Sequence, residues 1–81
     1  MNSFPFDQPI QNVSELEFAI FCIENLAKIQ DADVAQVYDA LVQSDILNGY
    51  IIPEYEVLHT QGKDYIMEDL LEVMKERGVA I

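Results

Sequence analysis

Basic residues are scarce in this chain, which has four lysines and arginines against 15 aspartates and glutamates and a formal net charge of −11. A surface with so few cations repels the phosphate backbone of nucleic acids and the anionic head groups of lipids. We therefore expect neither nucleic acid nor membrane among its partners. The charge either steers the chain toward a basic protein surface or only keeps it in solution, and the sequence leaves both interpretations open.

Cysteine, glycine and long apolar runs are also scarce. One cysteine permits no disulfide within the chain and no multi-cysteine metal site, and three glycines are too few for a phosphate-binding loop. The longest apolar run, residues 18–23, has six residues, whereas a membrane span needs about 20. Residues 1–10 contain no Lys or Arg, unlike the start of a signal peptide. We expect a cytoplasmic protein without cofactor or metal.

What the sequence does contain is enough apolar material for one small domain, since 51% of its 81 residues are hydrophobic. Pro5 and Pro9 block helix at the start, so residues 1–13 are predicted to be an extended N-terminal arm. Residues 14–78 show helical periodicity and no period-two alternation. They predict a single all-α domain, a small bundle of four main helices.

The first predicted helix, residues 14–29, is unusually apolar. Ser14 and Glu17 form a capping-box pattern at its start. A helix whose apolar residues cover more than half of its circumference either lies at the centre of a small bundle or lends a second stripe to another chain. The predicted stripe and the residues that widen it are Leu16, Ile20, Ile23 and Ala27 with Phe18, Phe21, Cys22 and Ile29.

Three further helices follow. The second has the most regular apolar spacing in the chain. Ser44 and Asp45 are predicted to cap one further turn through Ile46 and Leu47, which ends at Asn48-Gly49 with a left-handed residue. A short third helix is predicted from Pro53 to about Thr60 with Gly62 as its C-terminal cap. The fourth begins near Asp64 and ends at Gly78. The second helix places on one face Val34, Val37, Tyr38, Leu41 and Val42.

His59 is the only histidine, near the end of the predicted third helix. A general base needs a nucleophile within hydrogen-bond reach, and no spacing in the sequence brings Cys22 to His59. The simpler interpretation is that His59 caps helix carbonyls or bonds a nearby tyrosine or carboxylate. The apolar neighbours of Cys22 predict an inert core thiol. We therefore expect a protein that is not an enzyme.

Residues 18–27 and 50–66, together with the Val37-Tyr38 pair, carry a resemblance to a known family. Over roughly residues 14–78 the chain resembles the small bacterial proteins catalogued as domain of unknown function 3791, and the Leu-His-Thr-Gln-Gly segment at residues 58–62 is the most distinctive part. Genes of that family often lie beside genes for proteins that look like ADP-ribosyltransferases. The resemblance therefore implies an accessory or neutralising role toward the product of a neighbouring gene.

These observations favour an acidic helical protein-interaction module, an antitoxin-like or regulatory partner of another bacterial protein. A homo-oligomer formed through the first helix would also account for the apolar excess. The alternative is a small enzyme or ligand-binding subunit centred on His59 and the nearby tyrosines. The candidate interaction surface or functional corner comprises Phe18, Phe21, Tyr50, Tyr55, His59, Thr60 and Tyr65.

Overall fold

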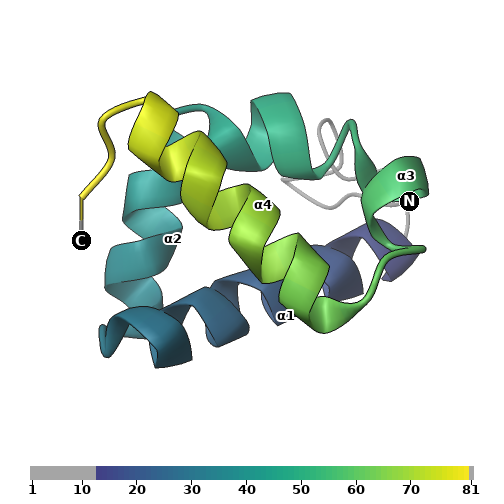
Figure 1. Ribbon diagram of the computed structural model, residues 1–81, viewed down its shortest axis with the longest axis horizontal. Helices are drawn as coiled ribbons and strands as arrows, with labels where there is room; N and C mark the ends of the chain where they lie inside the picture. The colour runs from purple at the N-terminus through teal and green to yellow at the C-terminus, as the bar shows by residue number, and fades with distance from the viewer. Residues whose placement is uncertain (1–12, 81) are drawn as a thin grey trace, which may run out of the picture.

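The computed structural model describes residues 13–80 of the chain, which form helices and connecting turns without any strand. The elements are α1 (Val13–Gln30), α2 (Val34–Gln43), the π-helical turn η1 (Leu47–Ile51), α3 (Tyr55–Leu58) and α4 (Lys63–Glu76) (Figure 1). The prediction of an all-α bundle with four main helices is confirmed. The predicted arm lies outside the described residues except for Val13, which begins α1.

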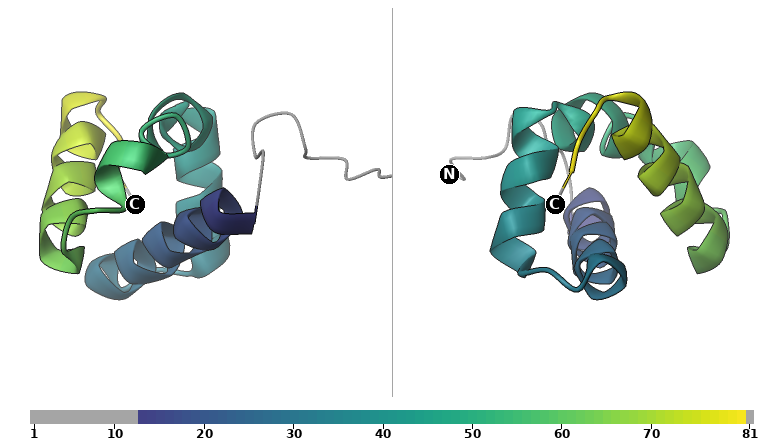
Figure 2. Two further views of the ribbon diagram at one scale, coloured as in Figure 1. Left: turned by 90° about the vertical axis from the view of Figure 1, so that its right-hand side faces the viewer. Right: turned by 60° about the vertical axis from the view of Figure 1, so that its left-hand side comes forward.

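Helix α1 is the element against which the two other long helices pack. It contacts both α2 and α4, and the right-hand view of Figure 2 shows it lying between them. Figure 1 shows α2 rising from the C-terminal end of α1, while α4 crosses the bundle diagonally. The turn η1 and the short α3 connect α2 to α4, and α3 lies near the N-terminal end of α1.

The hydrophobic core takes residues from all five elements, and no polar or charged residue among residues 13–80 is buried. Close packing of aliphatic side chains from facing helices supplies most of the stability that such a small domain has. Fully buried side chains are those of Cys22, Leu26, Val37, Leu41, Ile46, Ile51 and Leu70.

Helix α1 buries a different stripe from the one predicted. Ile20 is 44% exposed and Ile29 is 53% exposed, because α2 and α4 cover only one side of α1. The helix also begins one residue before Ser14, which places Ser14 inside the first turn and not at the capping position. The buried residues of α1 are Phe18, Ala19, Cys22, Ile23, Leu26 and Ala27.

Three helices end on a residue in the left-handed conformation. Gly78, with φ of 71°, ends α4 as predicted. Its N–H donates to the carbonyl of Lys75 at 3.1 Å, and the Val79 N–H donates to that of Met74 at 2.8 Å, the pair of bonds that defines a Schellman cap. Asp31 (φ 54°) ends α1 with the same bonding pattern, and Asp45 (φ 63°) follows α2.

Two of the predicted glycine caps are wrong. Asp45, not Gly49, is the left-handed residue after α2, and Gly49 lies inside η1. A Cβ at position 49 would meet the Asp45 carboxylate, so the exposed Asp45 side chain would have to move for any other residue there. Gly62 has extended backbone angles and precedes α4, so it does not close α3.

The π-helical turn η1 allows consecutive apolar pairs to face the same core. The Ile52 N–H donates to the Leu47 carbonyl at 3.1 Å, a bond that spans five residues. Residues five apart then share a face, so Ile46 lies with Ile51, and Leu47 lies with Ile52. All four side chains are buried.

The left-handed Asp31 predicts a stabilising substitution. Asp31→Gly removes the clash of Cβ with the backbone at positive φ, and we expect the free energy of unfolding to rise by about 0.5–1 kcal/mol in urea titrations. Asp31→Ala is the matched control, because it removes the same charge at the same position and keeps a Cβ at positive φ. Equal effects of the two substitutions would show that charge, not backbone strain, is responsible.

Candidate functional site

Four of the predicted site residues form a row of rings between α1 and α3. The Phe18 ring stacks on Phe21 with centroids 6.1 Å apart and meets the edge of Tyr55 at 5.5 Å. Tyr55 in turn stacks on His59 at 4.3 Å, with the two ring planes 11° apart. Contacts of this kind hold the short α3 against α1. His59 therefore has one ring face against Tyr55, and its role in this row is packing.

Tyr50 lies apart from this row and connects η1 to α4. Its hydroxyl donates a hydrogen bond to Oδ2 of Asp69 at 2.5 Å. That bond, followed by partial burial and the negative charge of Asp69, raises the pKa of Tyr50 to about 12. Ionised Tyr50 would lose the bond and face a carboxylate, so the phenol stays protonated at physiological pH.

The remaining members of the predicted corner lie on the surface. Tyr65, at the start of α4, is 54% exposed. The Thr60 hydroxyl donates to the Val57 carbonyl at 2.8 Å and so closes the end of α3. The structure thus separates the predicted corner into three parts: the ring row, the Tyr50–Asp69 hydrogen bond, and the surface residues Thr60 and Tyr65.

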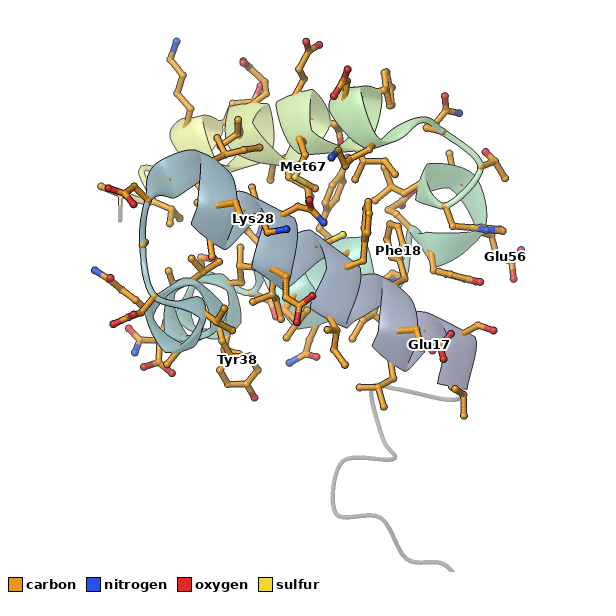
Figure 3. All side chains as sticks on the ribbon, turned by 90° about the horizontal axis from the view of Figure 1, so that it is seen from below. Glu17, Phe18, Lys28, Tyr38, Glu56 and Met67 are labelled. Carbon is orange, nitrogen blue, oxygen red and sulfur yellow. The ribbon has the colours of Figure 1, made fainter. Side chains whose placement is uncertain are left out.

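Phe18 and Cys22 are core residues, so they are not available as a docking surface. Phe18 is 8% exposed, and Figure 3 shows its ring directed into the bundle. Cys22 is fully buried, and its burial raises the pKa of the thiol to about 12. The prediction that Cys22 is a core residue is confirmed.

The surface feature that the sequence prediction missed is an apolar groove between α1 and α2. Ile20, Val34 and Tyr38 are 44%, 51% and 48% exposed. Figure 3 shows the Tyr38 ring directed away from the bundle. The regular spacing of α2 identified Val34 and Tyr38 as apolar helix positions, but the pattern does not say which of them a neighbouring helix covers. We call the lining of this hollow the α1/α2 groove; it comprises Ile20, Ile23, Glu24, Val34, Ala35 and Tyr38.

Acidic side chains surround the α1/α2 groove. Glu24 lines it, and Glu17, three residues before Ile20, lies beside Ile20 on the same side of α1. Asp39 follows Ala35 by one turn of α2. All three carboxylates are exposed. The groove thus combines an apolar floor with a negative rim.

No group of side chains within residues 13–80 indicates a cofactor or metal site. Within this range no three His, Cys, Asp or Glu side chains are grouped so that they could hold a metal ion. None of the helices there has both the length and the apolar character needed to cross a membrane. Two further hollows, one beside Lys28 and Asp31 and one between α1 and α4, are open and lined by mixed polar and apolar residues.

The fold and this surface define a small all-α domain with an exposed apolar groove. A family model, described as protein of unknown function (DUF3791), matches residues 17–77. The chain therefore belongs to this family, which confirms the resemblance. Neither the curated proteins nor the solved structures contain a match to the chain.

The Tyr50–Asp69 bond predicts a specific pH dependence of stability. Tyr50→Phe should lower the free energy of unfolding by about 1 kcal/mol at pH 7. In the wild type this contribution is complete below pH 10, the ordinary pKa of tyrosine in the unfolded chain. It falls as the pH rises from 10 toward the folded pKa of about 12, because only the unfolded state ionises there.

Urea unfolding between pH 7 and 12 measures this effect, with Tyr65→Phe as the matched control, since it also removes one phenol. The difference in stability between wild type and Tyr50→Phe should shrink above pH 10, whereas Tyr65→Phe should follow the wild type throughout. A constant difference across the whole range would contradict the assignment of the Tyr50–Asp69 bond.

Burial of Cys22 predicts that its thiol reacts only through unfolding. We expect a coloured disulfide reagent to label the native protein at pH 8 at least about a hundredfold more slowly than the protein in 6 M guanidinium chloride, because the thiol is fully buried and its pKa is about 12. Stoichiometric labelling of the native protein within the mixing time would show that α1 does not bury this face.

Proposed function

We propose that this protein is a non-enzymatic interaction module, an acidic helical partner that regulates or neutralises another bacterial protein. The observation that carries the proposal is the α1/α2 groove, where Ile20, Val34 and Tyr38 line one hollow and remain about half exposed. Apolar residues scattered singly on a surface are ordinary, but residues that line one hollow are typical of a binding site.

The amino-acid types in the groove support binding of a protein over binding of a small molecule. Small-molecule sites combine apolar walls with several convergent polar groups that orient the ligand. Here Glu24 is the only charged or amide side chain in the lining, and the hollow is open to solvent. Tyrosine at the centre of an apolar surface is a frequent energetic anchor of protein–protein interfaces.

The negative charge supports the same function. The first 62 residues contain ten acids and one base, Lys28, which gives this part of the chain a net charge of −9. Such a field accelerates encounter with a basic partner, while apolar contacts supply most of the affinity. Four of these ten acids lie on the two helices that form the groove, α1 and α2, and they are Glu15, Glu17, Glu24 and Asp39.

The alternative function, a small enzyme or ligand-binding subunit centred on His59, has weaker support. The ring of His59 is stacked on Tyr55, and Cys22 lies in the core with a pKa of about 12. The Cys22 thiol is therefore neither ionised at physiological pH nor accessible. Loss of a measured activity in His59→Ala, with partner binding unchanged, would favour this alternative.

Affinity capture with matched bait variants tests the proposed interaction. The tagged wild type should retain a stoichiometric protein from its native cell lysate through a moderate salt wash. Val34→Ser with Tyr38→Ser should lose at least about nine tenths of it, because interface anchors of this type contribute 2 kcal/mol or more. The control bait combines Val57→Ser with Tyr65→Ser, which removes an equally exposed valine and tyrosine from α3 and α4.

If both double variants retain the same protein, the interaction does not use the α1/α2 groove. Recovery of the wild-type chain alone would contradict the proposal of a stable partner. Circular dichroism of each bait verifies that the helices are intact, which we expect because all four substituted side chains are at least 48% exposed.

A further inference from the structure

Resting on the proposed function, we infer that the occupant of the α1/α2 groove is a basic amphipathic helix of a partner protein. Its apolar side chains enter the groove between Ile20, Val34 and Tyr38. Its lysines and arginines face the carboxylates of Glu17, Glu24 and Asp39. The inference follows from the shape of the groove, the charge at its rim and the absence of strands from residues 13–80.

The rim fixes the sign of the charge on the partner. Glu17 and Glu24 flank Ile20 at helix-neighbour spacing on α1, and Asp39 lies one turn beyond Ala35 on α2, so carboxylates stand on both helices that form the groove. Lys28 follows Glu24 by one turn of α1 and lines the adjacent hollow together with Glu24 and Val34, so three carboxylates face one cation in this region. An apolar segment flanked by lysine or arginine is complementary to this arrangement.

A second copy of this chain is the less suitable occupant. In a two-fold symmetric dimer the same surface meets itself, which would place the acidic rims of two copies, each with a net charge of −11, opposite one another. Like charges across an interface oppose association. The apolar floor alone would permit a dimer, but the rim disfavours it.

The secondary structure of the partner follows from what the described chain offers. An extended peptide gains affinity by adding to the edge of a sheet, and residues 13–80 contain no strand. A groove between two helices accepts instead the apolar face of a third helix, whose anchors recur at i, i+3 or i+4, and i+7. The helix of the partner then packs on the side of α1 that α2 and α4 leave exposed.

Selection from a display library of random helical peptides against the full-length chain tests the inference without knowledge of the natural partner. We expect enriched peptides to have a helical apolar stripe and a net positive charge. A representative peptide should bind Tyr38→Ser at least about tenfold more weakly than the wild type in fluorescence anisotropy. Tyr65→Ser is the control and should bind the peptide like the wild type.

Charge reversal separates the rim from the floor. Glu24→Lys should weaken binding of the same peptide several-fold and reduce its salt dependence, because one complementary charge becomes repulsive. Glu72→Lys, an equal charge change at an exposed position of α4, should have a much smaller effect. Equal effects of the two reversals would show that only the overall charge of the chain matters and would overturn the assignment of the rim.

The outcomes distinguish this inference from the proposed function. Enriched peptides that depend on Tyr38 but carry neutral or negative charge would overturn the basic partner and leave the groove as a binding surface. Basic peptides that bind Tyr38→Ser as well as the wild type would overturn the groove as their site. A groove-dependent dimer in sedimentation equilibrium would make a second copy the occupant. If no peptide is enriched on the wild type relative to the Tyr38→Ser variant, both the basic-helix inference and the proposed function are contradicted.

Discussion

Burial of one face of α1 is the constraint on which the rest of this structure depends. Cys22 and Leu26 are fully buried because α2 and α4 pack on that face, and the ring row from Phe18 to His59 fixes α3 to the same helix. Among residues 13–80 no further helix is left to cover the other side of α1. The exposed Ile20 and the adjoining side chains of α2 are a direct consequence.

The connections hold the remaining helices at the angles that this packing needs. Asp31 and Asp45 turn the chain sharply after α1 and α2, and η1 places two consecutive pairs of apolar residues on one face. Two polar contacts then position α4. Tyr50 bonds Asp69, and the Arg77 guanidinium donates to the Ser44 carbonyl at 3.1 Å. The packing of α2 on α1 also positions the residues that line the α1/α2 groove. Under the proposed function, this order within the chain lowers the entropic cost of binding a partner.

Much of the fold follows from periodicity, whereas the exposed surface does not. The spacing of Val34, Val37, Tyr38 and Leu41 predicts the helix α2, and Gly78 predicts where α4 ends. Both are local properties of the sequence. Which side of α2 is covered depends on where α1 crosses it, and that is a tertiary property. For the same reason Phe18 was included in the predicted surface, although it lies in the core. The left-handed residue after α2 is Asp45 and not Gly49, because Gly49 lies inside the π-helical turn η1. No apolar pattern in the sequence indicates that turn.

The most direct test of the central claim is chemical-shift mapping of the isotope-labelled chain during titration with a partner captured from the lysate or with a peptide selected against the full-length chain. If the α1/α2 groove is the binding surface, the largest changes fall on the amides and methyl groups of Ile20, Glu24, Val34 and Tyr38, and those of α4 beyond Met67 stay nearly constant. Changes centred on Tyr55, His59 and Tyr65 would place the functional surface at the other end of the bundle and contradict the account.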